Sequence, residues 1–378
     1  MTFLKQLWIR GMRRVRDEYE DTQSDIVCAR PLYRWLLYGF VGYLFCTICV
    51  GIYWSSAPAE LNVQTAIQRQ LALLKIPSQI PLPTGVATTS TLIAVSETLL
   101  DKPGGYLAND IFPPALWLDD MPHWELGVLL QVRDTTQMLR ASLSQSNLNH
   151  ELDVDLQKAE VRFNFSNNSW GFPSSESQYS SGIELLQQYN FRLLQADNSS
   201  AQFYVDAQHL NDYLAGVEQR LKNLSQRLTA SVGPSINTDS AAMPVKQVDS
   251  KKMVNGLYTK TPWLQLDDVF YEARGSSWAL IALLKGVEID FADVLQTKNA
   301  QASFDQIIRE LKPTQQTVYS PMILNGDGFG FVANHSLVMA SYLARAQAAI
   351  ADCRRQLLTP RRLIFCLVVC SIHFLDNS

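Results

Sequence analysis

An uncharged apolar segment near the N-terminus constrains this chain more than any other feature. It runs for twenty residues from Trp35 to Trp54. A helix of that length spans roughly 30 Å, the thickness of the hydrocarbon layer of a bilayer. Aromatic residues stand near both ends, where interfacial anchors belong. The segment therefore predicts a transmembrane helix at 35–54 rather than a buried core helix, with the lipid bilayer as its first partner.

The basic residues around this segment predict its orientation. Seven Lys and Arg residues fall within 1–34, whereas the first basic residue after the segment is Arg69. By the positive-inside rule the N-terminus is cytoplasmic and the remainder is exported. A cleaved signal peptide is the alternative, because Ser55-Ser56-Ala57 offers small residues. The apolar run exceeds the roughly 7–15 residues of a signal core, so we favour an uncleaved signal-anchor.

Composition indicates a globular exported part and excludes some functions. With 378 residues, 47% hydrophobic and 18% charged, the chain can bury a substantial core. Segments 1–34 and 354–378 carry net charges of +2 and +3, which leaves −9 between them in a total of −4. An acidic domain lacks the basic surface that binds nucleic acid. No cysteine lies between Cys49 and Cys353, which excludes a disulfide framework or a cysteine-ligated metal there.

The exported part reads mainly as helices separated by Pro, Gly and Asn. The predicted helices cover about 60–75, 88–100, 123–144, 148–163, 175–195, 206–228, 263–285, 291–295, 303–311 and 334–354. Between Leu214 and Leu228 the apolar residues step by three and four, which predicts a bundle or coiled-coil seam suited to helix-mediated association. We therefore expect a mainly α fold, with one transmembrane helix followed by a multi-helix, bundle-like extracytoplasmic domain.

The same patterns predict the domain organisation. We expect a short cytoplasmic segment at 1–34, the transmembrane helix at 35–54, a helical region at 55–228, a flexible linker at 229–252, a second helical region at 253–353 that packs with the first, and an atypical basic and apolar tail at 354–378.

Several carboxylates are candidate catalytic groups. Glu176 falls in the first turn of a helix among aromatic residues. Asp119 and Asp120, or Asp267, Asp268 and Glu272, could supply a second carboxylate, and Asp268 and Glu272 share one helix face at i,i+4 spacing. Two carboxyls that converged on a glycan would suit a hydrolase of the cell wall. The alternative, which we favour, is that these acids complement helix N-termini or lie on a solvated face.

A glycine-rich loop beginning at Asn325 is a candidate for binding. Asn325 and Asp327 occupy the first and third positions of a calcium loop, but Phe329 stands at the fifth, where a ligand is required. A turn that leads to a helix N-cap at Asn334 is the simpler interpretation. We keep Asn325, Asp327 and Asn334, together with Trp170, as candidates for contacting a small ligand or a partner.

Four groups of residues resemble those of a known family. They are Trp124–Gly127 with Gln131–Asp134, Ser169–Tyr179, Leu266–Gly275 and Asn325–Ser336. Together they resemble an uncharacterised proteobacterial family of single-pass inner-membrane proteins with a periplasmic domain of unknown function. The resemblance covers roughly residues 1–352 and implies an inner-membrane protein that faces the periplasm. It implies no activity, and the tail after about Asp352 departs from it.

These observations favour a binding function. No zinc-protease motif, nucleophile elbow or dinucleotide fingerprint occurs, so we predict neither a metal nor a cofactor. We expect a membrane-anchored periplasmic scaffold, or an accessory subunit of an envelope complex, with an unknown envelope protein as partner. The alternative is an envelope hydrolase that uses a carboxylate pair including Glu176.

Overall fold

The structure is a computed structural model of the chain. It describes residues 33–73, 75, 82–144, 152–195, 201–230, 262, 265–318, 323–324 and 333–359. Two compact units are present. The first contains the apolar helix Tyr33–Trp54, residues 55–56 and the segment Phe112–Trp117, and the second contains the remaining helices.

The first unit contains the predicted apolar helix. This helix has 22 residues and a mean hydropathy of 1.9, and it is the only described helix long and apolar enough to cross a membrane. Its side chains are exposed along most of its length, including Trp35, Phe45 and Ile52. It lacks the covering that surrounds the core helix of a globular domain.

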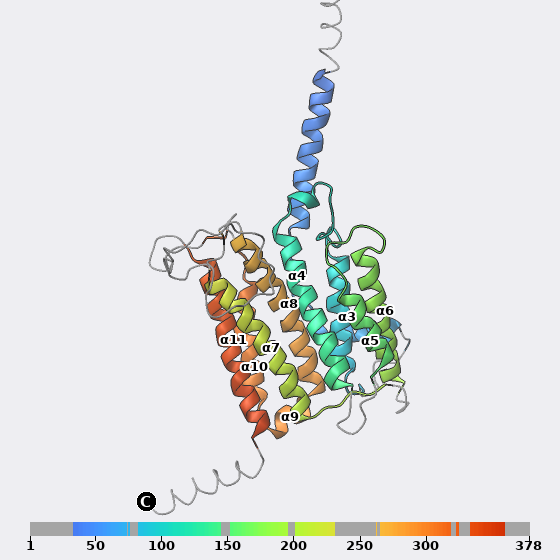
Figure 1. The fold of residues 1–378 in the computed structure, drawn as a ribbon, viewed down its shortest axis with the longest axis vertical. Coiled ribbons are helices and arrows are strands. Elements are labelled where there is room, and N and C mark those ends of the chain that lie inside the picture. The colour runs from blue at the N-terminus through green and yellow to red at the C-terminus, as the bar shows by residue number, and fades with distance from the viewer. Residues whose placement is uncertain are drawn as a thin grey trace, which may run out of the picture. The chain divides into compact units, whose positions relative to one another are not determined.

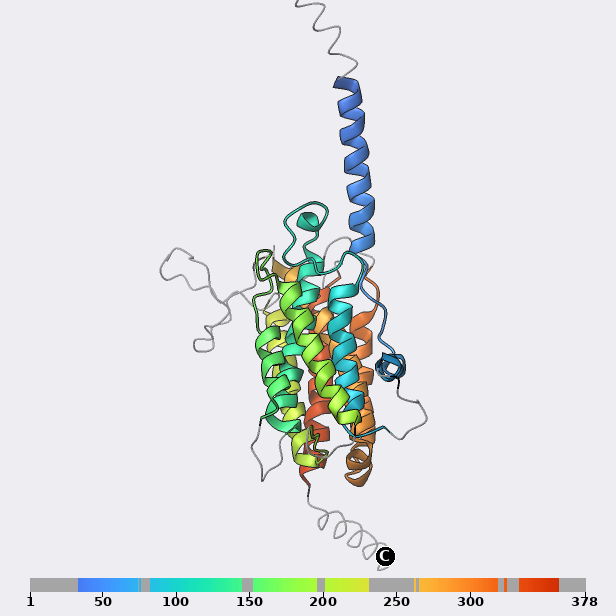
Figure 2. The ribbon, with the colours of Figure 1, turned by 90° about the vertical axis from the view of Figure 1, so that its right-hand side faces the viewer.

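The second unit confirms the predicted mainly α fold, because every regular element among its described residues is helical. In chain order the elements are α2 (Val63–Leu73), α3 (Val86–Asp101), α4 (Asp120–Met138), the π-helical segment η2 (Leu139–Leu143), α5 (Val154–Phe163), α6 (Ser175–Leu194), α7 (Ala207–Thr229), α8 (Leu266–Asp290), α9 (Ala292–Thr297), α10 (Gln301–Leu311), the 3₁₀ segment η4 (Lys312–Gln315) and α11 (His335–Leu358). The long helices form a bundle in which most neighbours run in opposite directions, whereas the adjacent helices α4 and α8 run in the same direction (Figure 1). Figure 2 shows α2 end-on, lying across the outside of the bundle.

Local signals explain where several helices begin. The side chains of Asp153, Ser174 and Asp206 accept hydrogen bonds from backbone N–H groups in the first turns of α5, α6 and α7. The Asn334 side chain caps α11 by accepting from Leu337 N at 2.9 Å, which confirms the predicted N-cap. Each of these caps satisfies a backbone donor that the helix itself leaves free.

Helix α8 forms the centre of the bundle, and glycines let it approach its neighbours closely. A Cβ atom added at Gly275 would lie 2.0 Å from the carbonyl oxygen of Trp124 on α4. A Cβ added at Gly127 of α4 would lie 2.1 Å from the carbonyl oxygen of Glu272 on α8. The two helices therefore cross backbone to backbone at this glycine pair.

The seam predicted between Leu214 and Leu228 is buried within the chain. Val217 and Leu221, like the residues at both ends of the seam, are almost fully buried, and α7 packs along α11. The prediction of a bundle seam is confirmed, whereas the expectation that the seam suits association with another protein is wrong, because α11 already covers it. Sequence periodicity identified the apolar face but not its partner.

Helices on both sides of the predicted linker belong to this one unit, since α7 packs on α11 and α4 packs on α8 (Figure 1). Most of the linker, from residue 231, lies outside the described residues. Helix α11 continues to Leu358, beyond the predicted start of the tail, and its Arg354 pairs with Glu218 of α7. The tail from residue 360 lies outside the described residues, and the domain boundaries remain a prediction.

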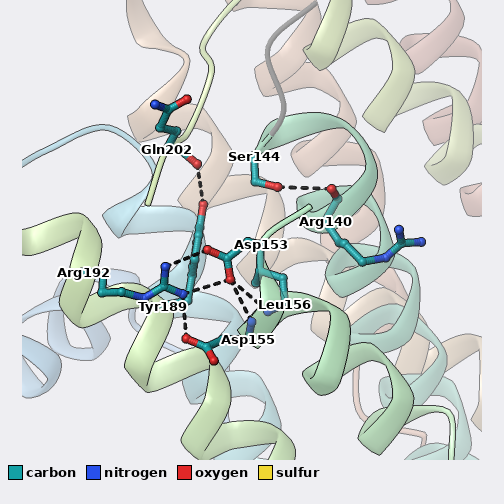
Figure 3. A network of polar contacts seen from close by, with 8 residues as sticks. All are labelled: Arg140, Ser144, Asp153, Asp155, Leu156, Tyr189, Arg192 and Gln202. Atoms are coloured by element: carbon teal, nitrogen blue, oxygen red, sulfur yellow. Dashed lines mark hydrogen bonds and ion pairs between the residues drawn. The ribbon is translucent and has the colours of Figure 1, made fainter. Parts of the chain in front are cut away.

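A polar network fastens α5 to α6 (Figure 3). The Arg192 guanidinium donates to both carboxylate oxygens of Asp153, at 2.8 and 2.9 Å, and to Asp155 at 2.6 Å. Asp153 is also the cap of α5, and the Tyr189 hydroxyl donates to the carbonyl oxygen of Gln202 at 2.7 Å. These polar groups are hydrogen-bonded to one another and to the backbone, so we interpret the network as stabilising the packing of α5 on α6.

Candidate functional site at one end of the bundle

The bundle topology gathers acidic residues at the end where α4, α6, α8 and α11 begin, the upper end of the bundle in Figure 1. We call it the acid-rich end. Its acids and their histidine are Asp119, Asp120, His123, Glu125, Glu176, Asp267, Asp268 and Glu272. Helix N-termini favour negative charge, which explains part of this distribution.

A histidine and two aspartates from α4 and α8 meet at this end. The Nε2 atom of His123 lies 3.0 Å from Oδ1 of Asp268 and 3.8 Å from Oδ1 of Asp119. One ligand atom from each residue lies within 4.8 Å of the others, a spacing that could hold a divalent metal ion. The same spacing serves an ion pair between a protonated His123 and the two carboxylates, so the geometry alone does not assign a metal. Sequence spacing does not reveal this group, because Asp119 and His123 lie far along the chain from Asp268.

Acids crowded beside this group have perturbed pKa values. Burial, with the charge of Asp267, raises the pKa of Asp120 to about 6, although the Tyr271 hydroxyl donates to it. Burial, with the charge of Asp120, raises the pKa of Tyr271 to about 12. Burial also raises the pKa of Asp268 against the opposing effect of His123. Groups of this kind are frequent at functional sites and also occur in structural networks.

Glu272 forms an ion pair with Arg227. Its two carboxylate oxygens accept from both terminal nitrogens of Arg227, at 2.6 and 2.7 Å, and its side chain is nearly buried. This bidentate pair joins α7 to α8. Glu272 and Asp268 therefore face different partners although both lie near the start of α8.

A second ion pair, which is fully buried, fixes the loop between α3 and α4. Lys102 Nζ lies 2.6 Å from Oε1 of Glu125, and neither side chain is exposed. Glu125 also accepts from the backbone N–H groups of Leu107 and Ala108, both at 2.8 Å. Burial raises the pKa of Glu125, while Lys102 opposes that rise. The pair holds this loop over the start of α4.

The next residue of this loop binds Glu176. Asn109 Nδ2 donates to Oε2 of Glu176 at 2.8 Å and to the carbonyl oxygen of Ser169 at 2.8 Å. Burial and the charge of Glu176 raise the pKa of Asp110. The carboxyl that interacts with Glu176 is thus Asp110, which the sequence did not single out, whereas Asp268 interacts with His123.

The loop before α6 presents two aromatic side chains to solvent. Trp170 is 70% exposed and Phe172 is fully exposed. The loop is nevertheless well held, because Ser169 N donates to Ser175 Oγ at 3.1 Å and Ser169 Oγ donates to the Pro173 carbonyl at 3.0 Å. We call Trp170–Phe172 the aromatic tip.

The other predicted binding residues contribute less. Asn325 and Asp327 lie outside the described residues. Asn334 caps α11, and His335 Nδ1 accepts from Leu324 N at 3.0 Å. In the described part of this region the polar groups hold the start of α11 in place.

Comparison with known proteins adds one family. A family described as "uncharacterized protein conserved in bacteria" (DUF2333) matches residues 31–360. No curated protein and no solved structure matches the chain.

Proposed function

The chain belongs to the DUF2333 family of uncharacterised bacterial proteins, and from this premise we propose that it is a membrane-anchored helical protein that acts by binding in the cell envelope. The N-terminus would lie in the cytoplasm and the bundle in the periplasm of a proteobacterial cell. The protein would serve there as a scaffold or accessory subunit of an inner-membrane complex.

The exposure of the apolar helix Tyr33–Trp54 carries the anchoring part of this proposal. Trp35, Phe45 and Ile52 are 74%, 67% and 69% exposed. Removing one large apolar side chain from water gains about 1.5–3 kcal/mol, so a whole helix of them in water would be strongly unfavourable. A bilayer covers such a helix along its full length.

The aromatic tip supports the binding part. Exposed Trp and Phe side chains on a well-held loop are typical of recognition surfaces, where aromatic residues contribute much of the binding energy. The acids proposed for catalysis have other partners, since Glu272 pairs with Arg227 and Asp268 with His123.

Photo-crosslinking in intact envelopes tests this proposal. A benzophenone amino acid at Phe172 of the full-length protein should give one defined protein adduct, and Trp170→Ser should abolish it. The same photoprobe at Val161, which is 68% exposed on α5, is the matched control. A defined adduct from Val161 but none from Phe172 would refute the tip as the binding surface. The orientation is tested by adding protease to intact cells and to spheroplasts whose cytoplasmic membrane is unbroken. Digestion of the bundle in the spheroplasts but not in the intact cells would support a periplasmic bundle, and full protection in the spheroplasts would contradict it.

A second candidate is an envelope hydrolase. In it Asp110, rather than an acid predicted from the sequence, would be the second carboxyl of the pair that includes Glu176. Its support is the proximity of the two carboxyls, since burial and the charge of Glu176 raise the pKa of Asp110, and glycan cleavage requires a pair of carboxyl groups. Release of soluble fragments from purified cell wall, lost in both Glu176→Gln and Asp110→Asn, would favour this candidate. No release by the wild-type protein would exclude it for that substrate.

A further inference from the structure

An uncharged apolar loop belongs to the same compact unit as the apolar helix. Residues 111–118 read IFPPALWL and are flanked by Asp110 and Asp119. Within this stretch, Phe112–Trp117 groups with the helix Tyr33–Trp54 rather than with the bundle. Such a loop beside a candidate membrane helix requires an explanation, because apolar loops on a water-facing surface are unfavourable.

The loop has a buried side and an exposed side. Pro114 and Ala115 are buried, whereas Phe112, Leu116 and Trp117 are 75%, 62% and 51% exposed. The turn closes on itself, since Trp117 N donates to the Pro114 carbonyl at 2.9 Å and Ala115–Trp117 form the 3₁₀ helix η1. The exposed side chains are therefore presented by an ordered turn.

The burial pattern of the helix identifies the part that is covered within this unit. Residues 33–46 are exposed, whereas coverage begins towards the C-terminal end, the end with Tyr53 and Trp54. At this end Thr47 and Gly51 are buried and Trp54 is partly covered, and these three positions share one helix face.

We propose that Phe112, Leu116 and Trp117 insert into the bilayer interface beside the C-terminal end of the apolar helix. This inference rests on the proposed membrane anchoring. Trp and Phe prefer the headgroup level, which is where a helix ending at Trp54 leaves the hydrocarbon. A lipid surface fits the loop better than a protein groove, because the loop lies next to the membrane helix and offers neither charge nor side-chain hydrogen-bond acceptors. The loop then forms a second point of membrane attachment.

Spin-label depth measurements on the full-length protein test this inference. The six cysteines are replaced by Ala, and single cysteines carrying a nitroxide are placed at Phe112 or Leu116. Phe45 within the helix and Val161 on α5 serve as controls for hydrocarbon and water, since all four side chains are exposed. The protein is reconstituted into vesicles of phosphatidylethanolamine and phosphatidylglycerol, and circular dichroism checks that each variant keeps its helical content.

The expected result is loss of collision with a water-soluble nickel chelate at Phe112 and Leu116, together with a gain of collision with oxygen. Val161 should show full access to the chelate. Protection at Phe45 combined with Val161-like access at Phe112 and Leu116 would overturn the interfacial loop and leave the anchor intact. Val161-like access at Phe45 would instead refute the anchor, and the inference with it.

Discussion

The crossing of α4 and α8 at Gly127 and Gly275 makes a sharp prediction for Gly275→Ala. The added methyl carbon would lie 2.0 Å from the carbonyl oxygen of Trp124 and 2.8 Å from its carbonyl carbon. Both atoms are backbone, so no change of side-chain rotamer relieves the overlap. The helices must instead move apart by more than an ångström, which loosens the Trp124–Trp278 contact and the Gln131–Ser276 hydrogen bond.

The expected magnitude follows from two opposing effects. Overpacking of a close contact costs about 3 kcal/mol when the neighbouring atoms cannot yield. Alanine in place of glycine inside a helix gains about 1 kcal/mol. We therefore expect Gly275→Ala to lower the free energy of unfolding by roughly 2 kcal/mol, and Tm by about 4–8 °C.

Thermal and urea unfolding of the full-length protein in detergent micelles, followed by circular dichroism, measures this effect. Gly216→Ala on α7 is the matched control, because its added Cβ would meet only the Met138 side chain, at an ordinary 3.6 Å. The control should be unchanged or more stable by up to about 1 kcal/mol. A Gly275→Ala variant as stable as the Gly216→Ala control would show that α4 and α8 do not cross backbone to backbone, and the reasoning would fail.

The remaining predictions concern the ion pairs and acids of the acid-rich end. Lys102→Met should destabilise the fold by about 3–5 kcal/mol at neutral pH, because it leaves Glu125 buried without its cation. Protonation of Glu125 relieves this penalty, so urea unfolding should show that the variant regains stability as the pH falls. A loss of unfolding free energy that is the same at every pH would contradict this explanation. Arg227→Leu should cost about 1–3 kcal/mol, and a second change, Glu272→Gln, should recover part of that loss in a double-mutant cycle. Asp120 has a pKa of about 6 when folded and lower when unfolded, so its charge opposes folding once the pH rises above its unfolded value. Asp120→Asn should therefore help stability more at pH 7.5 than at pH 4, and the reverse order would refute the raised pKa.

Much of the secondary structure followed from the sequence because its causes are local. The apolar run at 35–54, the periodicity of Leu214–Leu228 and the N-cap at Asn334 depend on residues within a few turns of one another. The observed helices accordingly follow the predicted ranges closely, as with Ala207–Thr229 for the prediction of 206–228. The residues predicted to form the apolar seam of α7 are also buried in the structure.

Tertiary structure alone decided which faces and charges meet. Sequence periodicity could not show that α11 covers the α7 seam, and i,i+4 spacing could not show that Asp268 and Glu272 turn to His123 and Arg227. Only the structure shows that Gly127 and Gly275 lie where α4 and α8 cross in close contact. Helix formation is governed by neighbouring residues, whereas partner choice depends on how the whole bundle excludes water, and residues far apart in the chain determine that outcome together.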